Sequence, residues 1–296
     1  MDKATVGIYD NHAREWLERR PWHPRVPVVQ ADVAALPFRR GALGAAWANC
    51  CYQHLRSVDL PMALADLHRA LDVGAPVAVT VHEGDGEGHR PGSAFPGRYF
   101  SQWSPERLTD LLVGAGFRAI GLELVGFALH ATAERAQSLP DTVGPDMRLL
   151  VCGLNPSIYA ADAGAAYARP SNRFWPAAIA AGLVERPRDP VHAFRHHRIG
   201  MTDLAKRATA RSAELSRSEY EAGAARLRRL VEWLGPEAVC FVGLEGYRIA
   251  LDRRATPGWQ PEGFAGRPAY LLPSTSGLNA HVRLADIVAH LSNLRQ

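Results

Sequence analysis

Apolar residues in the first half of the chain form short runs that alternate with longer amphipathic stretches. The short runs are rich in β-branched residues and are typical of strands, whereas apolar residues at three- to four-residue spacing are typical of helices. The predicted elements are strands over 45–51, 76–81 and 117–124, helices over 61–71 and 104–116, and a Gly- and Pro-rich loop over 83–97.

The second half repeats this alternation, and its strand-like runs are more apolar. The segment Ser216-Arg217-Ser218-Glu219 has the pattern of a capping box and predicts the start of a long helix. The other predicted elements are strands over 148–152, 238–242 and 269–272 and helices over 174–182 and 284–294. Helices that alternate with apolar strands predict a buried, parallel sheet. Ligands bind at the carboxyl ends of the strands in such sheets.

Between the two halves, residues 131–146 are polar and contain Pro and Gly, which predicts a linker. A chain of 296 residues also exceeds one average domain. We therefore expect two α/β domains, one over 1–139 and one over 140–296.

Hydrophobic residues make up 47% of the chain and charged residues 22%, as in ordinary globular proteins. We find no basic-then-apolar leader and no apolar run near the roughly 20 residues that cross a bilayer, so we expect a cytoplasmic protein with no membrane partner. The four cysteines lack the C-x-x-C spacing of zinc and iron–sulfur sites, and buried, unreactive thiols are the expectation. We expect neither a metal nor an organic cofactor.

Positive charge is concentrated in the second half. Residues 141–296 hold 20 Lys and Arg against 15 Asp and Glu, whereas residues 1–140 hold 14 against 15. An excess of this sign suits a domain that meets a polyanion such as DNA. A solvated, arginine-rich surface would have the same composition, and the charge by itself leaves both interpretations open.

Residues 32–38 read D-V-A-A-L-P-F. They resemble the D-x-x-x-L-P-F segment of class I S-adenosylmethionine methyltransferases, in which the acidic residue lies near the adenine. That family places a glycine-rich turn before this segment, and residues 1–30 contain no G-x-G. We favour a degenerate, truncated Rossmann-like methyltransferase domain. An active methyltransferase and an unrelated α/β module remain open.

Three polar segments lie near the predicted strands of the second half. They read G-L-N-P-S at 153–157, R-P-S-N-R-F-W at 169–175 and L-P-S-T-S-G-L-N at 272–279. In this order they resemble the G-I-N-P-G, P-x-N-R-F-W and P-N-P-S-G-L motifs of the mismatch-specific uracil-DNA glycosylases, the thymine-DNA glycosylase-like family. The spacing from Asn155 to Asn172 also agrees. The resemblance covers essentially all of 140–296 and implies a three-layer uracil-DNA-glycosylase-like fold with a short parallel sheet.

The implied reaction breaks the bond between C1′ of the sugar and N1 of a pyrimidine. The base must first leave the duplex, which costs a few kcal/mol and favours mispaired bases. The transition state resembles an oxocarbenium ion, so developing charge must be stabilised. The resemblance implies that Asn155 holds the attacking water through its side-chain carbonyl. An amide is a poor general base and therefore positions the water more than it deprotonates it. Without the resemblance, an Asn-Pro pair would be interpreted as a turn.

The resemblance also implies which residues border the extruded base. Tyr167 would stack on it, an interaction worth roughly 1–3 kcal/mol per base. A tyrosine in a Gly- and Ala-rich loop would otherwise be interpreted as a packing residue. The remaining base-contacting residues implied by the motifs are Gly153, Leu154, Asn172 and Ser274.

Contacts to the rest of the DNA are implied by the last motif and by the segment 200–204. Leu278 would be the apolar wedge that fills the vacated stack, with Ser276 and Gly277 close to the widowed guanine and the phosphates. The loop departs from the family at two positions, which puts opposite-base preference and affinity in doubt. For Lys206, Arg207 and Arg211, phosphate contacts and a solvated face are equally good interpretations.

Only two lysines occur, Lys3 and Lys206, and neither lies near Asn155 in the sequence. Glycosylases that also cut the strand need an amine, so we expect a monofunctional, monomeric enzyme acting on mispaired or damaged pyrimidines in double-stranded DNA. The adjacent His196 and His197 do not suit one metal ion, and we expect no metal site. Two rival functions remain, namely an S-adenosylmethionine-dependent methyltransferase and a catalytically idle mismatch-binding protein. The sequence leaves the preferred lesion undecided.

Overall fold

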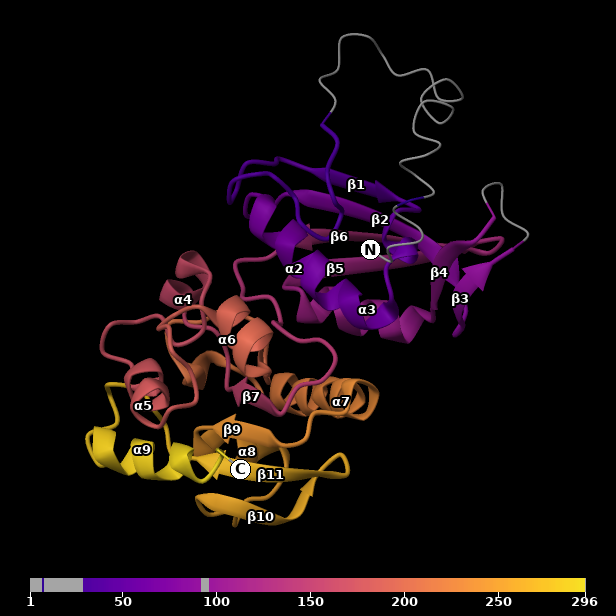
Figure 1. Ribbon diagram of the computed structural model, residues 1–296. Coiled ribbons are helices and arrows are strands. Elements are labelled where there is room, and N and C mark those ends of the chain that lie inside the picture. The colour runs from indigo at the N-terminus through magenta and orange to yellow at the C-terminus, as the bar shows by residue number, and fades with distance from the viewer. Residues whose placement is uncertain (1–6, 8–28, 92–95, 296) are drawn as a thin grey trace. The chain divides into compact units, whose positions relative to one another are not determined.

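The computed structural model of the protein describes residues 29–91 and 96–295, together with Gly7. The chain is a mixed α/β protein that divides into two compact units (Figure 1). One unit comprises Met1–Leu112 with Phe117–Arg135, and the other comprises Val113–Gly116 with Ala136–Gln296. Each unit contains its own β-sheet.

The strands and helices predicted over 45–51, 61–71, 76–81, 104–116 and 117–124 are all present, and three further strands, over 87–90, 98–103 and 128–135, were not predicted. They are β1 (Ala46–Asn49), α2 (Leu60–Ala70), β2 (Pro76–Glu83), β3 (Glu87–Arg90), β4 (Arg98–Trp103), α3 (Pro105–Gly114), β5 (Phe117–Val125) and β6 (Ala128–Arg135). Strand β2 pairs in parallel with β1 and with β4, whereas β6 pairs antiparallel with β2 and with β5. The segment that should bring a glycine turn, residues 1–30, lies almost entirely outside the described residues.

Two predictions for this unit are wrong. The loop expected over 83–97 contains β3, a polar strand that forms a hairpin with β4. Its side chains are exposed or half-buried at the edge of the sheet, so it lacks the apolar alternation that predicts strands. The linker expected over 131–146 begins inside β6, where Ala131 and Ala133 are buried against the core. The end of that stretch is buried as well, because Asp141 is 4% exposed.

The second unit is built around a short sheet in the order β10-β11-β9-β7-β8. Its elements are β7 (Leu149–Gly153), α4 (Ile158–Ala163), α5 (Phe174–Ala180), α6 (Pro190–His197), β8 (Ile199–Asp203), α7 (Arg217–Leu234), β9 (Val239–Val242), α8 (Leu244–Ala250), β10 (Gly258–Phe264), β11 (Arg267–Leu272) and α9 (Leu284–Ser292). Strands β11, β9, β7 and β8 are parallel, and only the edge strand β10 is antiparallel. The predicted buried, parallel sheet is therefore confirmed.

Helices cover both faces of this sheet, which gives three layers. Alternate strand residues, among them Val151 and Met201, pack against α5, α6 and α9 in one apolar cluster. The intervening residues face the other side, since side chains alternate along a strand. There Phe241 of β9 contacts Tyr247 of α8, with 4.9 Å between ring centroids, and Thr202 of β8 accepts a hydrogen bond from Arg226 of α7.

Helix α7 confirms the predicted capping box. The Ser216 hydroxyl accepts a hydrogen bond from the Glu219 amide, and the Glu219 carboxylate accepts one from the Ser216 amide. The helix ends at Gly235, which adopts a left-handed conformation with φ 58°. Nearly two turns into the helix, Gly223 approaches the backbone that follows β8. A Cβ at this position would lie 1.9 Å from the carbonyl oxygen of Leu204, so only glycine fits.

Candidate functional site

All three motifs meet at one edge of the second sheet. Residues 153–157 follow the carboxyl end of β7, residues 273–279 follow that of β11, and residues 169–175 lead into α5. Because β7, β9 and β11 are parallel, the carboxyl ends of these strands lie at the same edge. The fold therefore brings together segments that are more than 100 residues apart.

The side chain of Asn155 is held by its nitrogen. Nδ2 donates hydrogen bonds to the Arg207 carbonyl at 2.9 Å, to Thr209 Oγ1 at 2.8 Å and to the Pro156 carbonyl at 3.2 Å. Two carbonyl oxygens can only accept, so these contacts fix which end of the amide points toward them. Among the residues that the structure describes, none donates a hydrogen bond to Oδ1. The amide oxygen of Asn155 is therefore left available on a half-buried side chain.

Two side chains, those of Asp203 and Tyr167, converge on Gly153, the last residue of β7. A Cβ at this position would lie 2.3 Å from Asp203 Oδ1 and 3.1 Å from the Tyr167 hydroxyl oxygen. Glycine is therefore required here by the side chains that cross it rather than by its own backbone angles. The neighbouring Leu154 side chain points toward α8, where a Cβ at Gly246 would lie 2.1 Å from Leu154 Cδ1. Leu154 can thus offer its backbone to this edge, but its side chain packs elsewhere.

Asp203 is a buried acid at the carboxyl end of β8, and the sequence placed it in the segment 200–204 without giving its side chain a role of its own. It is 6% exposed, and its carboxylate accepts no hydrogen bond from any described residue. Burial raises the pKa of Asp203 to about 6; the charge of Lys206 opposes this rise, and that of Asp141 adds to it. Strand β8 was itself not predicted, which hid the strand-end position that would have pointed to Asp203.

Tyr167 lies beside Gly153 in a left-handed backbone conformation with φ 55°. Its ring stacks on that of Phe174 with 4.3 Å between centroids and 25° between planes. Burial raises the pKa of the Tyr167 hydroxyl well above its usual value. The indole nitrogen of Trp175 donates to the Ala166 carbonyl at 2.8 Å, which ties the Tyr167 loop to α5.

Asn172 and Arg173 connect the second motif to α5 and to the third motif. The Asn172 side-chain oxygen accepts a hydrogen bond from the Phe174 amide at 2.9 Å and so holds the helix start. The Arg173 guanidinium donates to the carbonyls of Ser276 at 2.7 Å and Asn279 at 2.8 Å, and also to that of Val282. Sequence reasoning did not assign this clamp to Arg173, because all of its acceptors are backbone atoms over 100 residues away.

The loop over 273–279 presents one apolar side chain to solvent. Leu278 is 95% exposed, the highest value among the large hydrophobic residues that the structure describes as exposed. The loop is braced beneath it. A Cβ at Gly277 would lie 2.7 Å from the Ser171 carbonyl oxygen, and Asn279 Nδ2 donates to the Ser274 carbonyl at 3.1 Å. The Ser276 hydroxyl accepts from the Leu278 amide at 3.3 Å.

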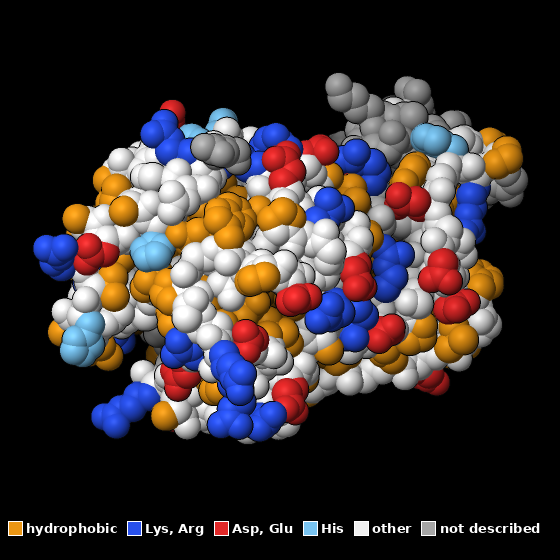
Figure 2. All heavy atoms as spheres, turned by 90° about the horizontal axis from the view of Figure 1, so that it is seen from below, with side chains coloured by type: hydrophobic (Ala, Val, Ile, Leu, Met, Phe, Trp, Pro, Cys, Tyr) orange, Lys and Arg blue, Asp and Glu red, His pale blue; other side chains and the backbone are white. Residues whose placement is uncertain are grey.

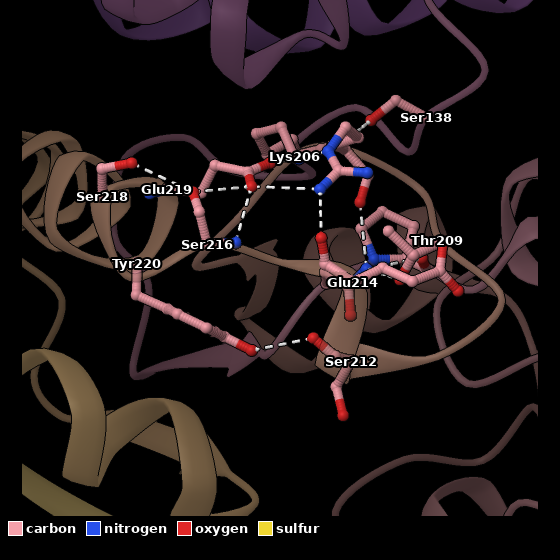
Figure 3. A network of polar contacts seen from close by, with 12 residues as sticks. Ser138, Lys206, Thr209, Ser212, Glu214, Ser216, Ser218, Glu219 and Tyr220 are labelled. Carbon is pink, nitrogen blue, oxygen red and sulfur yellow. Dashed lines mark hydrogen bonds and ion pairs between the residues drawn. The ribbon is translucent and has the colours of Figure 1, made fainter.

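The three basic residues named from the sequence differ in their availability. Lys206 is not free for a phosphate, because its ammonium group pairs with buried Asp141 at 2.8 Å and its side chain is 8% exposed. This corrects the expectation for Lys206. Arg207 is half-exposed, but its guanidinium pairs with Glu219 at 2.6 Å and donates a hydrogen bond to the Glu214 carbonyl. Figure 3 labels both of these acceptors, Glu214 and Glu219. Arg211 is exposed, and its side chain forms no ion pair with any described residue.

Charges of both signs are mixed on the surface. On the face drawn in Figure 2, Lys and Arg side chains lie among Asp and Glu side chains. Two of the four cysteines, Cys152 and Cys240, are buried, and burial raises the pKa of Cys240 to about 12. Within the part of the chain that the structure describes, no helix combines the length and the apolar character needed to cross a membrane.

Several solved structures are similar to the N-terminal part of the chain. One is a 1,6-didemethyltoxoflavin-N1-methyltransferase from Burkholderia thailandensis, with 23% identity and a TM-score of 0.33, covering 42% of this chain and 56% of that one. An S-adenosylmethionine-dependent methyltransferase from Methanosarcina mazei has 11% identity and a TM-score of 0.32, covering 41% and 75%. The [4+2]-cyclase SpnF has 20% identity and a TM-score of 0.32, covering 42% and 61%. The chain thus spans little more than half the length of the first of these.

The C-terminal part matches a family model. The model is that of the uracil DNA glycosylase superfamily, and it covers residues 140–293. This range contains all three motifs, the parallel sheet that aligns them and Asn155 at its carboxyl edge. Since the match extends over more than half of the 296 residues, the chain belongs to the uracil DNA glycosylase superfamily.

Proposed function

We propose that the protein is a monofunctional DNA glycosylase that hydrolyses the N-glycosidic bond of uracil, or of a related damaged pyrimidine, in mispaired double-stranded DNA. Asn155 carries this proposal. Its amide nitrogen donates to three acceptors, which fixes the direction of its oxygen, and no described residue donates a hydrogen bond to that oxygen at the edge where the motifs meet. An amide oxygen fixed in this way can hold a water molecule for attack on C1′.

The surrounding residues suit the other requirements of the reaction. Tyr167 stacks on Phe174 and crosses Gly153, so the rings border the surface over which a flat base would lie. Exposed Leu278 stands on a braced loop, as a wedge that enters the duplex needs a rigid support. Asn155 orients the water but is too weakly basic to deprotonate it, so catalysis relies on placing groups around the developing charge.

Asp203 is a further candidate for contact with the base. It lies across Gly153 without a hydrogen-bonding partner among the described residues, on the face that also carries the Tyr167 hydroxyl. A buried carboxyl favours its neutral form, and that form can donate a hydrogen bond to a carbonyl of the departing base. The departing base becomes negatively charged, so a neutral donor stabilises it whereas a carboxylate would repel it.

We keep the domain bounds that the sequence predicts. We assign residues 140–296 to the glycosylase and residues 1–139 to a truncated methyltransferase-like domain. The division of the structure between Arg135 and Ala136 supports a boundary in this region. Binding of S-adenosylmethionine to the purified protein, measured by calorimetry, would favour methyl transfer by the first domain instead.

The central test is single-turnover release of uracil from a G·U duplex by the full-length protein. We expect Asn155→Ala to lower the rate constant at least about 100-fold, by analogy with the loss of one oriented polar group in other active sites. Thr209→Val should also lower it, because the amide loses an acceptor that orients it, whereas Thr209→Ser should retain activity. Thermal unfolding of each variant checks that the fold persists.

Two results would contradict this proposal. Cleavage by Asn155→Ala at the wild-type rate would remove the role assigned to Asn155. Tight mismatch binding by the wild type without base release would instead support an idle binding protein. Lys206 is engaged by Asp141, so the abasic product should remain uncut until alkali is added, and borohydride should trap no covalent adduct.

A further inference from the structure

Three potential metal ligands meet in the second unit, away from Asn155. Glu185, His192 and His197 each offer one ligand atom, and these atoms lie within 4.8 Å of one another. Both histidines belong to α6, and Glu185 lies in the connection between α5 and α6. The carbonyl of His197 accepts a hydrogen bond from Arg148, the residue directly before β7. His197 therefore lies near the amino ends of the strands, at the edge opposite to the one that carries Asn155.

Each of the two histidine rings contains a buried nitrogen that has no hydrogen-bonding partner in the described part of the chain. His192 is 9% exposed. Among the described residues, none forms a hydrogen bond with His192 Nδ1 or with His197 Nε2, although both atoms are buried. Buried polar atoms are nearly always paired, so two unpaired ring nitrogens in one cluster require an explanation. A neutral imidazole nitrogen is a good metal ligand, and a bound ion would satisfy both rings.

We propose that Glu185, His192 and His197 form a zinc site. Two imidazole nitrogens and one carboxylate oxygen are a donor set that zinc accepts, with water in the fourth position. Zinc–nitrogen bonds of about 2.0–2.1 Å at tetrahedral angles place two ligand atoms roughly 3.4 Å apart. The three ligand atoms lie within 4.8 Å of one another, so small side-chain rotations would bring them to the separation that zinc requires.

Charged groups around the cluster are of both signs. Arg186 and Asp189 interact electrostatically with His192, and the Asp189 carboxylate also accepts a hydrogen bond from the His192 amide. The exposed Glu185 carboxylate supplies the negative charge of the proposed ligand set. His196 stacks on His192 with 4.3 Å between ring centroids and 28° between ring planes.

The proposed zinc ion would link the α5–α6 connection to both ends of α6. A ligand that binds only the folded state raises stability in proportion to its affinity and concentration. The site lies at the edge opposite to Asn155, so uracil release should not depend on zinc. Failure of the zinc site and failure of the glycosylase assignment are therefore distinguishable.

The test uses tag-free, full-length protein stripped of metal by a chelator. Zinc titration by calorimetry should show one equivalent bound, and cobalt(II) should give visible absorption bands of a four-coordinate ion that zinc then removes. Glu185→Gln, His192→Asn and His197→Asn should each weaken zinc binding at least tenfold. His281→Asn, which changes an exposed histidine outside the cluster, should leave the affinity unchanged.

Unchanged zinc affinity in Glu185→Gln and in both histidine variants would overturn the proposal, as would the absence of stoichiometric binding by the wild type. Glu185 is exposed, so its substitution preserves the fold and keeps the test decisive even where a histidine variant is unstable. Zinc should also raise the unfolding temperature of the wild type, and it should raise that of the Glu185→Gln protein by less.

Discussion

Two acidic residues of the second unit show how neighbours decide what the same side chain does. Asp141 and Asp203 are both nearly fully buried. Burial opposes ionisation of Asp141, but the charges of Arg226 and Lys206 hold its pKa below the ordinary value. Asp203 forms no such direct pair with any residue that the structure describes, and burial raises its pKa to about 6. Asp141 is therefore an ionised residue that stabilises the fold, whereas Asp203 changes its protonation state close to neutral pH.

Replacing Asp203 by asparagine should stabilise the protein above pH 6. The native carboxyl ionises near pH 6 and the unfolded one near 4, so the native state binds more protons between these values and loses stability as pH rises through them. Asp203→Asn removes this penalty, which the difference between a native pKa of about 6 and an unfolded pKa of about 4 sets at roughly 1–3 kcal/mol. Urea unfolding at pH 8 and at pH 4 measures it, and the gain should vanish at the lower pH.

The same substitution tests the role that we propose for Asp203 in catalysis. In the proposed role the Asp203 carboxyl acts in its neutral form, so the rate of uracil release by the wild type should fall as pH rises through about 6. This fall in rate should be missing in Asp203→Asn. An unaltered pH–rate profile in the variant would show that Asp203 does not act on the base.

At the scale of elements, periodicity predicted the apolar strands and the long helices but missed strands with polar or small residues. Strand β8 reads I-G-M-T-D, and its apolar residues are too few to give a pattern. It becomes a strand because it pairs with β7 along its whole length. Strand β10 is polar and half exposed for the same reason as β3, since both lie at a sheet edge.

In helix α7, packing and helix propensity predict opposite effects of Gly223→Ala on stability. Propensity alone predicts that Gly223→Ala stabilises the helix by about 1 kcal/mol. The new Cβ would lie 1.9 Å from the Leu204 carbonyl oxygen, and backbone cannot move aside cheaply. We expect Gly223→Ala to lower the free energy of unfolding by more than about 2 kcal/mol, as overpacking does.

The adjacent position provides the matched control. Ala222 is exposed on the same helix, so Ala222→Gly should follow propensity and cost about 1 kcal/mol. Both variants are compared with the wild type by urea unfolding. A Gly223→Ala protein more stable than the wild type would show that α7 does not pack on the backbone after β8.

At the scale of the whole molecule, a buried ion cluster connects segments far apart in the sequence. Asp141 pairs with Arg226 at 2.6 Å and with Lys206 at 2.8 Å, and it accepts a hydrogen bond from the Thr202 hydroxyl at 2.6 Å. The cluster therefore joins the start of the second unit to β8 and α7. It replaces the linker that the polar composition of 131–146 predicted.

Asp141→Asn should destabilise the protein by about 3–5 kcal/mol at pH 7, because two buried cations lose their partner. The native pKa of Asp141 is lowered, so the stabilisation is present above pH ~4 and is lost as pH falls below that value. The difference between wild type and variant in urea unfolding should shrink accordingly. Asp146→Asn, an exposed acid in the same segment, should have little effect.

The sequence by itself determined the local features of this protein. Apolar periodicity identified most strands and helices, the capping box located the start of α7, and three ordered motifs indicated the glycosylase family and Asn155. These features depend on neighbouring residues, so they can be deduced from short stretches of chain.

Only the tertiary structure decided which distant side chains meet. Lys206 pairs with buried Asp141, and the Asp203 side chain crosses Gly153. Arg173 donates hydrogen bonds to the loop that carries Leu278. The possible ligand atoms of Glu185, His192 and His197 lie close together. Each contact joins residues brought together by the order of the strands or the path of a connection. Local periodicity specifies which face of an element is buried, but it does not specify which partner covers that face.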